Sequence, residues 1–264
     1  MKRAPHPGSQ LPHLGTYHRV LPVSLERLYE NALDWAHLPH LHAASFASIE
    51  CVSADAGGWR ARVRSAEGDA FEVELLLDRT CRRWITRTLA GTNAGSEVWT
   101  HAFAMEPRRT DVVVDFFAPN VPAEAREKVG SAFADLYRRL YDEDESMMVE
   151  RQRMLDQRIE MPRVVEPLRL GRRTELRLPL SVDFAGRSWV IVEVQGALVA
   201  YAARCPHMLG PLARAPLAGS EVVCPWHGYR FDVLSGACTS GSAHRLPAAP
   251  AVIETDGIVT LQRV

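Results

Sequence analysis

Two short loops, each with one cysteine and one histidine, constrain this chain more than any other feature. Cys205 and His207 form the first pair, and Cys224 and His227 form the second pair sixteen residues further on. Zinc also accepts two cysteines and two histidines. However, prolines and glycines beside these ligands favour two loop tips that close over an inorganic cluster. The spacing therefore predicts a 2Fe-2S cluster in which two thiolates bind one iron and two imidazoles bind the other.

The two loops resemble those of Rieske proteins, and the resemblance covers about 90 residues from near Glu175 onward. Rieske proteins of respiratory complexes carry one further cysteine in each loop, and the matching positions here are Gly210 and Trp226. Tyr229 stands where those proteins have a hydrogen-bonding serine. The resemblance therefore implies a cluster of the low-potential kind found in ferredoxins and oxygenases.

A second group of metal-binding residue types lies near the N-terminus. Asp34, His37 and His42 follow the pattern Asp-x2-His-x4-His. They lie on a predicted helix that begins after an N-cap at Ser24, continues through His37 and is bent or ended by Pro39. Two histidines and one carboxylate form the facial triad of non-heme Fe(II) oxygenases. The alternative is a helix end that is merely rich in histidine.

This segment, with Asn31, resembles the catalytic motif of Rieske non-heme iron oxygenases of the ring-hydroxylating alpha-subunit type. The resemblance implies that His37 and His42 bind iron. It also implies that Asp34 links His37 to a cluster ligand of a neighbouring subunit, and that a carboxylate from the last helix completes the iron site. Asp144 is the first choice for that third ligand. The alternatives in the same acidic run are Asp142, Glu143 and Glu145.

The hydrophobic pattern predicts two domains. Alternating apolar residues over 48–119 indicate an antiparallel sheet, and helical spacing over 122–158 indicates one long helix. This combination predicts an α+β fold, a helix-grip (START-like) domain that encloses an apolar cavity. We expect this catalytic domain at 1–160, a linker at 161–174 and a small all-β Rieske domain at 175–264.

Composition narrows the range of partners and compartments. The net charge of −1 argues against nucleic acid or an anionic membrane as a partner. The first residues lack an apolar signal stretch, so a soluble, cytoplasmic protein is expected. Five cysteines without such a signal do not indicate a disulfide scaffold. We expect the three that lie outside the motif, Cys51, Cys81 and Cys238, to be buried.

The resemblance also implies a function. A ferredoxin or an NAD(P)H-dependent reductase would supply electrons to the cluster, and the cluster would supply them to Fe(II), where O2 is used to hydroxylate or demethylate an apolar, aromatic or cyclic substrate. No glycine-rich dinucleotide motif occurs, so a partner must deliver the electrons. Family members usually place the Rieske domain first and form head-to-tail trimers, whereas the domain order here is reversed. The alternative is a non-catalytic Rieske electron-transfer protein whose helix-grip domain binds a ligand.

Overall fold

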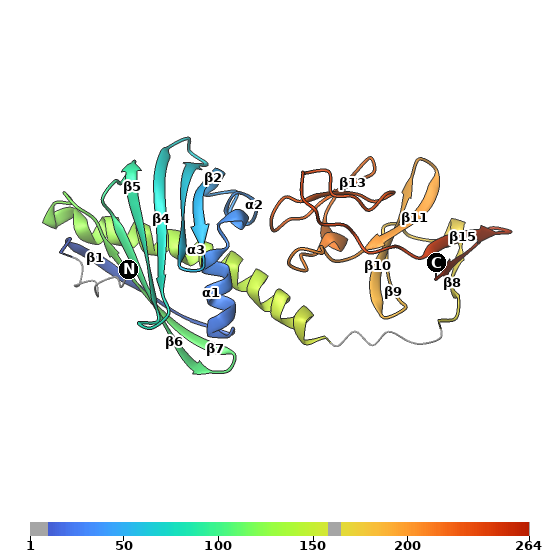
Figure 1. Ribbon diagram of the computed structural model, residues 1–264, viewed down its shortest axis with the longest axis horizontal. Helices are drawn as coiled ribbons and strands as arrows, with labels where there is room; N and C mark the ends of the chain where they lie inside the picture. The colour runs from blue at the N-terminus through green and yellow to red at the C-terminus, as the bar shows by residue number, and fades with distance from the viewer. Residues whose placement is uncertain (1–9, 158–164, 264) are drawn as a thin grey trace. The chain divides into compact units, whose positions relative to one another are not determined.

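The computed structural model describes residues 10–157 and 165–263 of the chain (Figure 1). The chain divides into two compact units, Met1–Gln152 and Arg153–Val264. The predicted domain boundary at residue 160 lies outside the described residues.

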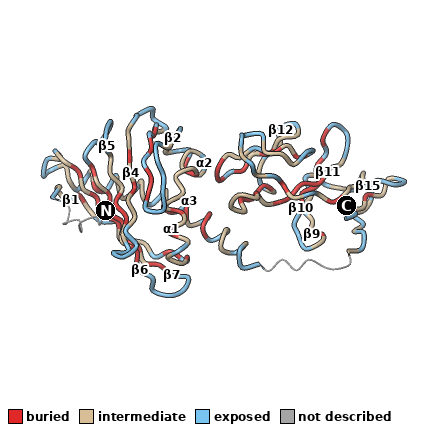
Figure 2. Tube along the Cα trace, in the orientation of Figure 1, coloured by how far each residue is buried: buried red, intermediate tan, exposed pale blue. Residues whose placement is uncertain are grey.

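The first unit is built on a seven-stranded antiparallel sheet with the strand order β1-β7-β6-β5-β4-β3-β2. Alternate residues of β7, including Val112, Val114 and Phe116, are buried, because successive side chains of a strand point to opposite faces. Buried positions of this kind recur along the strands in Figure 2. The strands are β1 His13–Leu21, β2 Phe46–Asp55, β3 Gly58–Ser65, β4 Ala70–Asp78, β5 Arg83–Gly91, β6 Glu97–Glu106 and β7 Arg109–Phe117.

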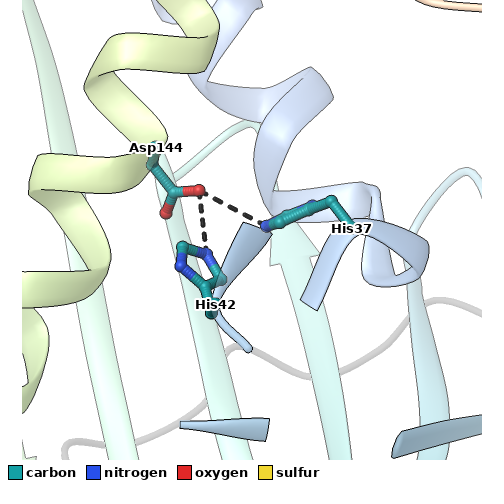
Figure 3. A group of neighbouring side chains, drawn as sticks. All are labelled: His37, His42 and Asp144. Atoms are coloured by element: carbon teal, nitrogen blue, oxygen red, sulfur yellow. Dashed lines mark ion pairs between the residues drawn. The ribbon is translucent and has the colours of Figure 1, made fainter. Parts of the chain in front are cut away.

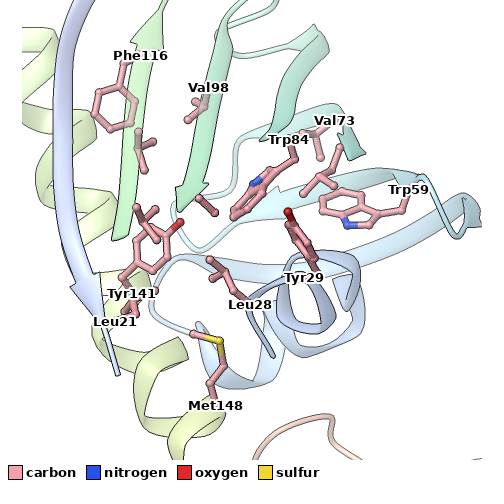
Figure 4. Packing of buried hydrophobic residues seen from close by; sticks show 14 of the residues in the cluster. Leu21, Leu28, Tyr29, Trp59, Val73, Trp84, Val98, Phe116, Tyr141 and Met148 are labelled. Atoms are coloured by element: carbon pink, nitrogen blue, oxygen red, sulfur yellow. The ribbon is translucent and has the colours of Figure 1, made fainter. Parts of the chain in front are cut away.

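The long helix α3 packs on this sheet and confirms the predicted helix-grip fold. Phe133 of α3 stacks on Phe116 of β7 with their ring centroids 5.4 Å apart. Tyr141 and Met148 of α3 lie in the same buried cluster as Trp59 and Trp84 (Figure 4). The helical segments are α1 Leu25–Leu33, the 3-10 turn η1 Trp35–His37, α2 Leu38–Leu41, the 3-10 turn η2 Ala123–Ala125 and α3 Arg126–Asp156, of which α3 extends past the end of this unit at Gln152.

The first helix is shorter than the sequence predicts. Its N-cap is confirmed, since the Ser24 side chain accepts a hydrogen bond from the backbone N–H of Arg27. The helix does not continue through His37, however, because Asp34 leaves helical geometry with φ −88° and ψ 78°. Pro39 has no N–H to bond to the carbonyl one turn earlier, so it is accommodated in the first turn of a new helix, α2.

The second unit consists of short strands in three three-stranded sheets and confirms the predicted all-β class. Its core gathers Phe184, Trp189, Ile191 and Leu261. The strands are β8 Leu168–Arg172, β9 Leu180–Phe184, β10 Arg187–Val194, β11 Ala197–Ala202, β12 Leu217–Ala218, β13 Glu221–Val223, β14 Arg230–Asp232, β15 Ala251–Thr255 and β16 Ile258–Gln262. Two 3-10 turns accompany them, η3 Arg173–Glu175 and η4 Leu212–Arg214.

Two expectations about these units are wrong. The predicted linker, 161–174, includes β8, which pairs with β16, so this part of the linker belongs to a sheet of the second unit. The three cysteines outside the motif are not buried: Cys81 is exposed, and Cys51 and Cys238 are half-buried.

No helix among the described residues is both long and apolar enough to cross a membrane.

Candidate metal centres

The structure brings three of the predicted iron ligands together in the first unit (Figure 3). His37 ends η1, His42 follows α2, and Asp144 projects from α3. Oδ1 of Asp144 lies 3.3 Å from Nε2 of His37 and 3.1 Å from Nε2 of His42. The exposed fractions are 3% for His37, 1% for His42 and 9% for Asp144. Two imidazoles and one carboxylate therefore meet at one buried point, and such a donor set fits a divalent metal ion.

The carboxylate of Asp144 and the imidazole of His37 stabilise each other's charged forms. Burial alone would raise the pKa of Asp144, but hydrogen bonds from His37 and His42 outweigh it and hold this pKa well below its usual range. Burial lowers the pKa of His37, whereas the nearby carboxylates of Asp144 and Asp34 raise it, with a net value of about 10. The carboxylates therefore favour positive charge at this point, and a bound metal ion would replace the proton of His37 there.

Other side chains orient the three candidate ligands. Nδ2 of Asn31 donates a hydrogen bond of 3.0 Å to Oδ1 of Asp144. Oε2 of Glu143 lies 2.6 Å from Nδ1 of His42, while Oδ2 of Asp34 lies 3.6 Å from Nδ1 of His37. A carboxylate next to Nδ1 favours the tautomer whose unprotonated Nε2 can bind a metal. Each histidine is thus turned with Nε2 toward Asp144.

The four acidic side chains at positions 142–145 of α3 make different contacts. Asp142 and Glu145 both form ion pairs with Arg19 of β1, at 2.5 Å and 2.6 Å. Glu143 contacts His42 through Nδ1, the nitrogen on the far side of the ring from Asp144. Of these four carboxylates, Asp144 is the one whose oxygen lies close enough to both histidines for the three side chains to bind one metal ion. The contact between Glu143 and His42 carries no signal in the sequence, because the two residues are 101 positions apart.

Glu143→Gln is expected to weaken binding of Co(II) at the histidine pair by roughly tenfold. The neutral amide lacks the negative charge with which Glu143 stabilises the Nδ1–H of His42. Titration calorimetry of the full chain with Co(II) measures this affinity. Asp142→Asn is the matched control, since it removes a charge one residue away that contacts Arg19 instead. Equal Co(II) affinities for the two variants would show that Glu143 does not support the site.

A cavity of about 550 Å³ adjoins the triad. His37, Asp34 and Asp144 lie in its wall, together with aromatic side chains that include Trp59 and Trp84. Nε1 of Trp59 donates to the carbonyl of Ala32 at 2.9 Å, so this indole presents its apolar ring to the cavity rather than its N–H. His37 and Asp144 therefore face a cavity of the size that binding sites for small molecules usually have.

In the second unit, two tight loops bring the cysteine and histidine pairs together. The loop of Cys205 follows β11, and the loop of Cys224 joins β13 to β14. Backbone bonds close both loops: Cys205 N–H donates to the Gly210 carbonyl at 2.9 Å, and Cys224 N–H to the Tyr229 carbonyl at 2.8 Å. The rings of His207 and His227 lie 4.5 Å apart between centroids at an interplanar angle of 86°.

The donor atoms in these loops fit a cluster. A Cβ added to Gly210 would lie only 2.7 Å from Sγ of Cys224, so glycine keeps the space beside this sulfur open. Contact with the Cys205 thiol lowers the pKa of Cys224, as suits a thiolate ligand, and the same contact raises the pKa of Cys205. Nδ1 of His207 and Nδ1 of His227 are buried and make no hydrogen bond within the described part of the chain. These four side chains would hold a 2Fe-2S cluster.

The comparisons with known proteins agree with this geometry. Residues 166–251 match the family model of the Rieske [2Fe-2S] domain, so the chain contains a Rieske domain. A stretch of 72 residues, 27% of this chain, is 29% identical to methylxanthine N1-demethylase NdmA of Pseudomonas putida. The matched part spans only 19% of that protein's length.

Solved structures resemble parts of this chain. The structure of TTHA0849 from Thermus thermophilus is similar to 53% of this chain, with 98% of its own length covered, 20% identity and a TM-score of 0.43. The ferredoxin of carbazole 1,9a-dioxygenase from Nocardioides aromaticivorans IC177 is similar to 37% of this chain, with 98% of its own length covered, 24% identity and a TM-score of 0.34.

Proposed function

We propose that this chain is a Rieske-type oxygenase component that hydroxylates or demethylates an apolar, aromatic or cyclic compound. The meeting of His37, His42 and Asp144 at the wall of a cavity of about 550 Å³ carries the proposal. When bound, a ferrous ion at the triad would offer open positions for dioxygen, and the 2Fe-2S cluster would supply electrons singly. The local match to a protein named as a demethylase supports the demethylation option.

In this proposal, some residues around the triad orient the metal ligands and others line the substrate cavity. Asn31 and Glu143 fix the orientation of Asp144 and His42 through hydrogen bonds of 3.0 Å and 2.6 Å. The indoles of Trp59 and Trp84 shield the cavity from water and offer flat apolar surfaces to a ring. Exclusion of water matters because bulk solvent would compete with the substrate for the space beside the metal.

Electron supply requires partners. We propose a ferredoxin or an NAD(P)H-dependent reductase as the donor to the cluster held by Cys205, His207, Cys224 and His227. Asp34, which lies 3.6 Å from His37, is proposed to connect that histidine to a cluster ligand of a neighbouring subunit in a homotrimer. A catalytic domain within 1–160, followed by the Rieske domain in the reversed order, is part of the same proposal.

Oxygen uptake tests the oxygenase function. The purified chain, loaded with cluster and Fe(II), should consume O2 with NADPH and a ferredoxin reductase only when a suitable ring compound is added. A panel of methylated and unmethylated bicyclic compounds serves as the screen, and product analysis separates hydroxylation from loss of a methyl group. Rapid reduction of the cluster without oxygen uptake on any compound, in protein that holds Fe(II), would instead support the electron-transfer alternative.

A further inference from the structure

The charged side chains of the cavity wall in the first unit form one buried group and one exposed group. Asp34, His37 and Asp144 form the group at the triad. The other charged side chains of the wall, Glu67, Asp69 and Arg139, are all exposed, so their charges can lie in solvent where the cavity opens. The remaining described residues of the wall are neutral. A ligand that fills this space must therefore be uncharged along its buried length, because an unpaired buried charge is costly.

Hydroxyl groups interrupt the apolar wall in the stretch nearer the open end. Thr88 of β5 and Ser96, just before β6, face each other across the last pairing before the β5–β6 turn. Oγ of Ser96 donates a hydrogen bond of 3.1 Å to Oγ1 of Thr88, and both residues line the cavity. Ser96 is 4% exposed. The Thr88 hydroxyl, having accepted this bond, still has its own proton to donate.

The hydroxyl pair lies far from the triad along α3. Phe133 of α3 stacks on Phe116, which pairs with Val98, and Val98 is two residues from Ser96 on the same face of the sheet. Ser96 therefore lies on the part of the sheet that packs against Phe133, which precedes Asp144 by eleven residues. At 1.5 Å per helical residue, Phe133 and Asp144 are roughly 16 Å apart along the helix axis, so the hydroxyl pair and the triad lie at different parts of the cavity wall.

We propose that the cavity selects an uncharged, elongated ring compound with a carbonyl or ether oxygen at its distal end, and that Thr88 donates a hydrogen bond to this oxygen. One end of the compound lies at the triad, and the other lies at the Thr88 and Ser96 hydroxyls. That the bound compound is a substrate rests on the proposed oxygenase function. The binding itself does not, because it requires neither metal nor electrons.

Two matched probes test the proposal. 2-Acetylanthracene and 2-ethylanthracene have the same rings and nearly the same shape, but only the first carries an oxygen that can accept a hydrogen bond. Quenching of tryptophan fluorescence measures their binding to the cluster-loaded chain, since Trp59 and Trp84 line the cavity. The ketone is expected to bind about three- to tenfold more tightly, as one neutral hydrogen bond allows.

The double variant Thr88→Val/Ser96→Ala should bind both probes equally. It removes both partners of the hydroxyl pair, so no buried donor is left without an acceptor. Thr86→Val is the matched control, because Thr86 lines the same cavity on the same strand and should not affect the preference for the ketone. Thermal unfolding of each variant verifies that the fold is retained.

Three results would overturn the proposal: equal affinities of the two probes for the unaltered chain, a preference that survives in the double variant, or a preference that Thr86→Val abolishes. Anthracene-2-carboxylate extends the test to charge. It is expected to bind at least about tenfold more weakly than the ketone, and equal or tighter binding would contradict an uncharged ligand. Since no turnover is measured, these results are independent of whether the chain consumes O2.

Discussion

His37→Ala is expected to remove the mononuclear iron and all substrate-dependent oxygen uptake, while the visible absorption of the cluster stays unchanged. The variant deletes one of three converging donors and leaves Asp144 with His42 as its single histidine partner in the group. Two protein ligands in a buried pocket hold a divalent ion far less tightly than three. Metal analysis, absorption spectroscopy and oxygen consumption of the purified variant measure the three effects.

His40→Ala provides the matched control. His40 lies on α2 between the two proposed ligands, but it is exposed and lies outside the cluster of potential metal ligands. It should keep its iron and its turnover. Oxygen uptake that persists in His37→Ala, or that disappears equally in both variants, would contradict the assigned role of His37.

Cys224→Ala is expected to have the opposite outcome, with loss of the cluster absorption and of electron acceptance but retention of the mononuclear metal. Cys224 is 1% exposed and its sulfur lies beside Cys205 and Gly210, so no other described thiol can replace it without rebuilding the loop. The visible absorption of the iron–sulfur chromophore and Co(II) binding at the triad follow the two sites independently.

Cys238→Ala is the control for this second variant. Cys238 lies in the same unit, is half-buried, and bonds to Ser240 rather than to a proposed cluster ligand. It should retain the full absorption. Cluster absorption that survives in Cys224→Ala, or that is lost in Cys238→Ala, would show that the ligands of the cluster have been misassigned.

Sites encoded by short spacings could be predicted from the sequence. The pairs Cys205 with His207 and Cys224 with His227 each lie within one loop, so their proximity follows from chain connectivity alone. The hydrophobic alternation of β7 and the helical spacing of α3 likewise reflect local geometry, and both elements appear in the structure. For this reason the Rieske domain and the helix-grip fold could be predicted from the sequence.

Features that depend on tertiary contacts were harder to predict from the sequence. The choice among four neighbouring carboxylates depends on how α3 is rotated about its axis. The other three contact Arg19 or His42, and the sequence does not show these contacts. α1 ends early at Asp34, although the sequence has no helix-breaking residue at that position. The interpretation of β8 as part of a linker follows from the prolines and the basic residues of 161–174, which outweigh a strand of only five residues.

The ratio of iron to acid-labile sulfide in the chain, loaded anaerobically with Fe(II) and freed of excess metal, is the most direct measurement. A cluster alone contains equal amounts of the two elements, and a mononuclear site adds one iron without sulfide. Iron held by His37, His42 and Asp144 predicts three irons for every two sulfides, falling to an equal ratio in His37→Ala. An equal ratio in the unaltered chain would contradict the mononuclear iron site and the oxygenase function built on it.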